Sequence, residues 1–233
     1  VGLLGPDARR AIIPTVAEQY TPVPEHSTTI TSGPAWRIRI LQGRTDTTSL
    51  IQELDELASI SPLPAWTTPE RTALIQQLQK LLTDQRSTVR ASALTALNVI
   101  APMESRDGVW KALRSEATGE RHAALQAIRN IPDQELVNAL AERLGDRDDG
   151  LLARETLLAI GGPQAEQAIL TRLSTDRQLL LLDLFELLAQ IGGHESVRAL
   201  ERMAETGPDL FVRSVAGQRA RELSKRLDEK HRE

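Results

Sequence analysis

One short pattern recurs along this chain and limits what the chain can fold into. From Ile100 onward, consecutive copies end 31, 29 and 31 residues apart. That length accommodates two helices of roughly a dozen residues each with short turns, so the sequence predicts stacked helical hairpins. Each copy reads Leu-x-x-Ile, or once Ile-x-x-Ile, and the copies end at Ile60, Ile100, Ile131, Ile160 and Ile191.

The segment from Arg177 to Gly193 shows how deeply such a helix is expected to be buried. At about 100° per residue, its apolar side chains cover more than half of the helix circumference, whereas Asp183, Glu186 and Gln190 share one narrow stripe. Such a helix must be buried on three sides. A composition of 40% hydrophobic but only 3% aromatic residues also suits close helix packing. We therefore predict an all-α fold, a right-handed α-solenoid of about five to six helical hairpin repeats.

Residues that start and stop helices place the individual hairpins. Asp46 begins a helix that ends near Pro62, and Pro69 lies in the first turn of the next helix, where its missing N–H is harmless. The spacing from Ile60 to Ile100 is nine residues longer than the spacing from Ile100 to Ile131, and the extra residues lie around 62–68. The helix pairs that follow are expected at 69–82 with 87–100, 103–114 with 119–131, 133–144 with 150–160, 163–173 with 177–191, and 194–206 with 209–227.

The first 45 residues differ from the regular repeats. Residues 1–19 are expected to form a partial repeat helix, which Pro14 ends or kinks. Residues 20–45 are expected to form an arm rich in Pro and Thr, in which Trp36, Ile38 and Ile40 fall on one side of an extended strand. Two interpretations stay open: the arm lies along the solenoid, or the strand pairs with another chain. The solenoid itself is expected over 46–233.

Composition narrows the partners and leaves the compartment open. A net charge of −4 gives no general attraction to polyanions, so no nucleic acid is expected as a partner. The absence of cysteine excludes disulfides and thiolate metal sites, but it does not select a compartment; the cytoplasm is slightly favoured and the periplasm is the alternative. No apolar run reaches the roughly 20 residues of a membrane span. The chain begins on Val1 without a leader, so we expect upstream segments to be missing.

Several local motifs mark the ends and turns of the repeats. They are Asp84 with Val89-Arg90 and Ala93-Leu94-x-x-Leu97, the junction Ile160-Gly161-Gly162-Pro163-x-Ala165, and Ile191-Gly192-Gly193. With these motifs, the helix pairs resemble bacterial HEAT-like repeats, of the type also found in phycobilin lyases, over about residues 46–227. In that family the Asp and Arg of successive repeats form a buried hydrogen-bonded ladder, so the resemblance implies structural roles for Asp84 and Arg90.

The metal-binding and catalytic motifs of enzymes built from similar repeats are mostly absent from this sequence. Deoxyhypusine hydroxylases carry repeated His-Glu pairs that bind two irons, and here His194-Glu195 is a single pair. The four histidines are scattered, without metal-ligand spacing. The run from Asp146 to Gly150 does not match a calcium loop, because Leu151 and Leu157 occupy positions six and twelve. No further motif selects a phycobilin lyase. We therefore predict no catalytic residue, metal or cofactor, and a protein that is not an enzyme.

Alignment of the second helices on their Leu-x-x-Ile endings predicts a binding surface on the concave face. A polar-to-acidic row does not suit DNA, because phosphate binding requires Lys and Arg. We expect this row to bind a protein or peptide, basic or polar in character, so that the chain acts as a scaffold or adaptor; the oligomeric state stays open. The row, called here the second-helix row, consists of Asp55, Thr95, Gln126, Glu155, Asp183, Glu186 and Gln190.

The alternative function rests on the C-terminal helix. There the basic residues outnumber the acidic ones, which would suit a HEAT-like enzyme or a nucleic-acid-binding protein. The basic residues are Arg213, Arg219, Arg221, Lys225, Arg226, Lys230 and Arg232.

Overall fold

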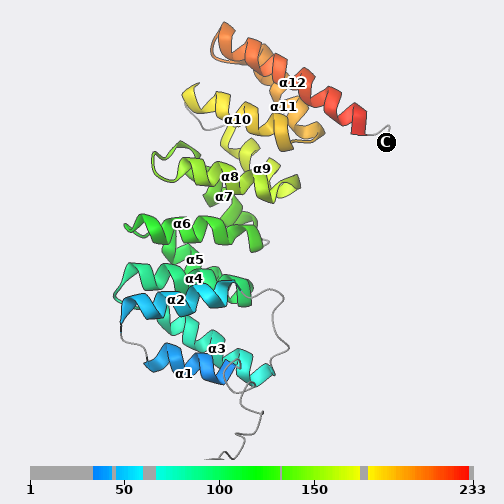
Figure 1. Ribbon diagram of the computed structural model, residues 1–233. Helices are drawn as coiled ribbons and strands as arrows, with labels where there is room; N and C mark the ends of the chain where they lie inside the picture. Colours follow the sequence, from blue (N-terminus) through cyan, green and yellow to red (C-terminus); the bar gives the residue numbers. More distant parts are fainter. Residues whose placement is uncertain (1–33, 44–45, 60–66, 132, 174–177, 231–233) are drawn as a thin grey trace, which may run out of the picture.

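The computed structural model describes residues 34–43, 46–59, 67–131, 133–173 and 178–230 (Figure 1). Within these residues it contains twelve α-helices, three short 3-10 turns and no strand, so the predicted all-α fold is confirmed. The helix predicted within residues 1–19 lies outside the described residues. The helices are α1 (Pro34–Gly43), α2 (Thr47–Ala58), α3 (Thr68–Leu81), α4 (Ser87–Ile100), α5 (Arg106–Ala112), α6 (Thr118–Ala127), α7 (Gln134–Glu142), α8 (Gly150–Ile160), α9 (Gly162–Leu173), α10 (Gln178–Ile191), α11 (His194–Thr206) and α12 (Leu210–Lys230).

Consecutive helices pair into six hairpins, each with an odd-numbered first helix and an even-numbered second helix. The hairpins stack in chain order from α1 at one end to α12 at the other (Figure 1). Every second helix packs against the next: α2 on α4, α4 on α6, α6 on α8, α8 on α10 and α10 on α12. The fold is an α-solenoid, as predicted.

Helix ends agree with the start and stop signals in the sequence. The side chain of Asp46 accepts a hydrogen bond from the Ser49 N–H at 2.8 Å and caps α2. Thr67 and Glu70 form a reciprocal capping box at the start of α3, with Pro69 in the first turn. These side chains satisfy N–H groups that have no partner inside the helix.

The two Gly-Gly junctions have different physical causes. Gly161 and Gly162 have φ angles of 58° and 61°, in the left-handed region that side chains with a Cβ disfavour. At the second junction, Gly192 has ordinary φ but lies against the Leu188 carbonyl and the Ser196 side chain, so a Cβ would collide with both. The same Gly-Gly motif therefore permits a left-handed backbone turn at the first junction, and at the second it leaves room for neighbouring atoms that a Cβ would displace.

The strand predicted at Trp36 to Ile40 is wrong, because these residues lie in α1. Ile38 and Leu41 are three residues apart, which places them on one side of a helix, and they pack into the same core as α3 and α4. The Arg37 side chain reaches the buried carboxylate of Glu53 on α2 at 2.7 Å. An isolated strand would leave its backbone groups unpaired, whereas a helix pairs them internally. Residues 34–43 are thus the first helix of the first hairpin and not part of an arm; residues 20–33 lie outside the described residues.

The core runs along the stack between the two helix layers. It consists of two adjoining clusters, one from Leu41 to Ala101 and one from Leu94 to Leu223. In α10 the side chains of Leu184, Phe185, Leu187 and Leu188 are all fully buried, which confirms the predicted burial of this helix on three sides. Each hairpin therefore depends on its neighbours for most of its buried surface.

Leu188→Ala should lower the free energy of unfolding by roughly 2 to 5 kcal/mol, because it leaves a cavity in this core. Leu151→Ala is the matched control, since Leu151 on α8 is 72% exposed and its truncation should change stability little. Urea unfolding followed by far-ultraviolet circular dichroism measures both. A loss below about half a kcal/mol for Leu188→Ala would show that α10 is not in the core.

Candidate interaction surface

The second-helix row lies on five consecutive second helices. Asp55 is on α2, Thr95 on α4, Gln126 on α6, Glu155 on α8, and the other three members are on α10. Most of the row is exposed, and only Thr95 and Glu186 are half-buried. Because each of these helices packs on the next, the row follows the stack through successive layers.

Positive side chains balance the row at its α10 end. Asp183 faces Arg154 of α8 at 3.7 Å, and Glu186 accepts from Arg219 of α12 at 2.6 Å. The Gln190 amide also donates to Glu186, at 2.9 Å. The repeat pattern did not indicate these pairs, because each joins different positions of two neighbouring second helices, whereas the pattern compares equivalent positions. The row is thus less acidic here than its own residues indicate.

Elsewhere the row keeps unbalanced negative charge. Asp55 and Glu155 are exposed, and neither forms an ion pair with any residue that the structure describes. Glu155 lines a shallow hollow of about 330 Å³ between α6 and α8, which Arg129 also borders. The full lining is Gln126, Arg129, Leu152, Glu155, Thr156 and Ala159.

Arg90 joins two repeats through a main-chain contact and an ion pair. Its guanidinium donates to the main-chain carbonyls of Asp84 and Gln85 at 2.6 and 2.9 Å. It also forms an ion pair with Glu120 of the next second helix, and Glu120 is only 7% exposed to solvent. The side chain of Asp84 instead binds Arg86, at 2.8 and 2.9 Å. Asp84 and Arg90 therefore both have structural roles, without a direct bond between their side chains.

The same arrangement recurs at Arg121, 31 residues further along the chain. Arg121 donates to the carbonyls of Ser115 and Glu116 and binds the Asp149 carboxylate at 2.8 Å. Asp149 is only 2% exposed, and His122 lies 3.5 Å from its other oxygen. The spacing of 31 residues between Arg90 and Arg121 equals one repeat and could have indicated a second arginine of this kind. The acceptor Asp149 is not among the residues of the motif around Asp84 and Arg90.

The pKa of Asp84 falls from its ordinary 3.8 to about 2, mainly because of the hydrogen bonds from the Arg86 side chain. Asp133 is a second case at the start of α7. Burial raises the pKa of Asp133. Hydrogen bonds from the Arg106 side chain and from the N–H groups of Leu136 and Glu135 lower this pKa by more than burial raises it, so the net shift is downward. Both carboxylates are therefore held in the ionised form by contacts that tie down helix starts.

The basic C-terminal helix uses several of its cations inside the fold. Arg226 donates to the carbonyls of Ala189 and Gly192, both at 2.7 Å, and so satisfies the end of α10. Arg219 binds Glu222 as well as the row residue Glu186, at 2.6 Å each. Lys225 lies 3.8 Å from Glu229. These contacts leave less free positive charge for a polyanion than the sequence indicated.

Within the described ranges, no group of three or more His, Asp or Glu side chains is arranged to hold a metal ion. In the same residues, no helix is both long and apolar enough to cross a membrane.

Arg121→Met should destabilise the protein by roughly 3 kcal/mol, because it leaves the buried Asp149 carboxylate without its closest cation. Arg147→Met is the control, since Arg147 is exposed in the neighbouring turn. Chemical unfolding of both variants measures the difference. Equal stability of the two would show that the inter-repeat pair contributes nothing.

Asp84→Asn should cost stability at neutral pH and lose that effect in acid. A folded-state pKa of about 2, against an ordinary 3.8, means that the ionised carboxylate stabilises the fold above about pH 4 and that this contribution disappears as the pH falls toward about 2. The shift corresponds to at most about 2.5 kcal/mol, and solvent screening of the pair reduces this value. Urea midpoints near pH 7 and near pH 2 measure it, with exposed Glu104→Gln as the control. A difference between parent and Asp84→Asn that stays constant with pH would contradict the assignment.

Comparison with known proteins agrees with this architecture. Residues 72–161, from within α3 to the end of α8, match a family model described as HEAT repeats. Two engineered proteins solved as structural-genomics targets are similar in structure. The first has 21% identity and a TM-score of 0.47, over 82% of this chain and 96% of its own; the second has 24% identity and a TM-score of 0.44, over 80% of this chain and 56% of its own. No curated protein matches. Residues 72–161 are therefore similar to HEAT repeats, and they lie within a stack of similar helical hairpins.

Proposed function

We propose that this protein is a non-catalytic scaffold that binds a basic or polar segment of a partner protein along the second-helix row. HEAT repeats generally serve as protein-interaction scaffolds. The observation that carries the proposal is the row itself, whose exposed polar side chains follow one another over five stacked second helices. In such folds the buried residues set the shape, while the exposed ones are free to suit a partner.

The shape of this surface favours an extended contact. Its hollow between α6 and α8 is about 330 Å³ and is bordered mainly by polar and small side chains. It offers no deep apolar pocket for an aromatic anchor, the kind of contact that dominates tight interfaces. A segment lying across several repeats, held by many modest polar contacts, fits this surface best.

The charges of the row indicate where a basic segment makes its contacts. Asp55 and Glu155 form no ion pair within the described part of the chain, so each can pair with a Lys or Arg of the partner. At α10 the carboxylates already face Arg154 and Arg219. The proposal therefore assigns the main electrostatic contacts to α2 and α8.

The test is the double variant Asp55→Lys plus Glu155→Lys, probed on a peptide array graded in net charge from acidic to basic. The parent chain should bind basic peptides, and the variant should bind them about tenfold or more weakly, because two attractions become repulsions. Binding should also weaken at high salt.

The matched control is Glu104→Lys plus Glu142→Lys, which makes the same change in net charge at exposed sites near α5 and on α7. This control should bind like the parent chain. If the row variant and the control give the same pattern on the array, the second-helix row is not the binding surface.

A further inference from the structure

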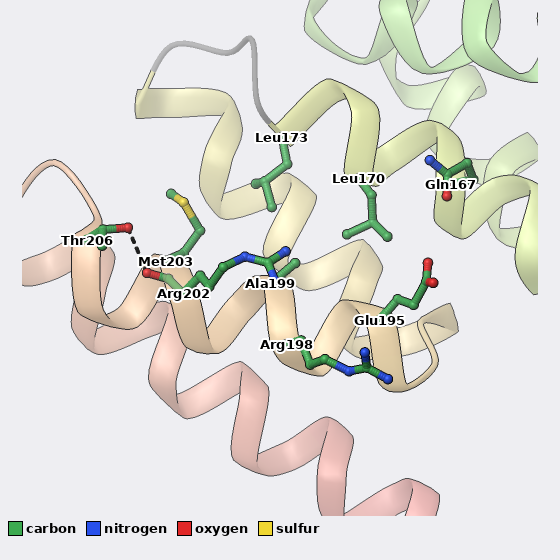
Figure 2. Close-up of a pocket in the computed structure, with 9 residues that line it drawn as sticks. All are labelled: Gln167, Leu170, Leu173, Glu195, Arg198, Ala199, Arg202, Met203 and Thr206. Atoms are coloured by element: carbon green, nitrogen blue, oxygen red, sulfur yellow. Dashed lines mark hydrogen bonds between the residues drawn. The ribbon is translucent and has the colours of Figure 1, made fainter.

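A groove lies between α9 and α11, in the layer of first helices and away from the second-helix row. Its volume is about 530 Å³, larger than the hollow between α6 and α8. Figure 2 shows that the described residues of its lining come from these two helices. The lining residues are Gln167, Leu170, Leu173, Glu195, Arg198, Ala199, Arg202, Met203 and Thr206.

The floor of the groove is apolar. Leu170 and Leu173 come from α9, and Ala199 and Met203 come from α11. Leu173 and Ala199 are buried, whereas Leu170 and Met203 are partly exposed to solvent along the groove. Covering such a surface with an apolar side chain is favourable, because water leaves both surfaces.

The rim carries two cations that the fold does not use. Arg198 and Arg202 lie one turn apart on α11, both exposed, and neither forms an ion pair with a residue that the structure describes. This contrasts with Arg90, Arg121 and Arg219, whose guanidinium groups hold repeats together.

The charge along the groove is not uniform. Glu195, at the first turn of α11, is the one carboxylate among the described residues that line the groove, and Figure 2 shows the Arg198 side chain reaching back toward this end while Arg202 lies further along α11. The same helix carries exposed Glu201 and Glu205 outside the lining. Arg198 and Arg202 are therefore the cations of the groove that a partner's carboxylates can reach.

We propose that this groove binds an acidic amphipathic helix of a partner protein. One stripe of the helix covers Leu170, Ala199 and Met203, and flanking carboxylates pair with Arg198 and Arg202. From Glu195 to Thr206 the groove follows α11 for roughly 16 Å, which matches about three turns of a bound helix.

This assignment goes beyond the scaffold function proposed above, because it uses different helices and the opposite partner charge. A chain with both surfaces can hold a basic segment on its second helices and an acidic segment on its first helices. The two proposals fail independently, since a variant of one surface leaves the other unchanged.

The experiment measures fluorescence anisotropy with three labelled synthetic peptides of about three helical turns. The first is an amphipathic helix of Leu, Ala and Glu with a continuous apolar stripe. The second has the same composition in scrambled order, and the third replaces each Glu with Lys. The parent chain should bind the first peptide about tenfold or more tightly than the other two, and more weakly as salt rises.

Two variants locate the contact. Arg198→Gln plus Arg202→Gln should weaken binding of the first peptide about tenfold, and its binding should lose its salt dependence. Met203→Gln should also weaken it, without a change in charge. Arg198 and Arg202 are exposed, whereas Met203 also packs against the core, so the circular dichroism spectrum and the unfolding midpoint of each variant must match those of the parent chain.

The matched control is Arg221→Gln plus Lys225→Gln, which removes the same charge from exposed positions on α12. This control and the Asp55→Lys plus Glu155→Lys variant should bind the first peptide like the parent chain. The proposal is overturned if the parent does not bind the first peptide, binds the scrambled peptide equally well, or binds it as tightly after the Arg198 and Arg202 changes.

Discussion

The packing of each second helix on the next is the interaction on which the rest of this structure depends. A single hairpin of about 30 residues cannot enclose a core, so its apolar surface is buried only when neighbouring hairpins cover both sides. The Leu-x-x-Ile endings supply that surface: Leu97 and Ile100 are buried at the end of α4, as is Leu188 in α10. This stack fixes the positions of the exposed rows on either layer.

Close stacking also covers polar groups at the helix ends, and arginines compensate for that. Arg90 and Arg121 bind carbonyls of their own hairpin turn and a buried carboxylate of the next repeat. Each therefore links a turn to its neighbour and fixes how far two hairpins slide past each other. Arg226 on α12 links repeats differently, by donating to the carbonyls of Ala189 and Gly192 at the end of α10. Buried pairs of this kind specify an arrangement more than they add stability, because desolvation offsets much of their attraction.

The sequence predicted the features that periodicity controls, and it failed where a contact between separate segments decides. Helix positions from α3 to α12 followed from apolar spacing and turn residues. The helix at Pro34–Gly43 was missed because five residues of alternation fit a strand as well as one turn of a helix, and the buried partner Glu53 lies elsewhere in the chain. The residues of the row lie on second helices, but Arg154 and Arg219 were not foreseen as its counter-charges, and the groove between α9 and α11 had no signal in the repeat pattern.

Hydrogen–deuterium exchange of the full chain tests most directly whether stacked second helices hold the protein together. Backbone amides exchange slowly where opening a helix exposes much buried surface. The amides of α4, α6, α8 and α10 should therefore exchange slowest and at similar rates, since each is packed between two other second helices, while those of α5 and α9 exchange faster. If α5 and α9 were protected as strongly as α6 and α8, the stack of second helices would not be the element on which the fold depends.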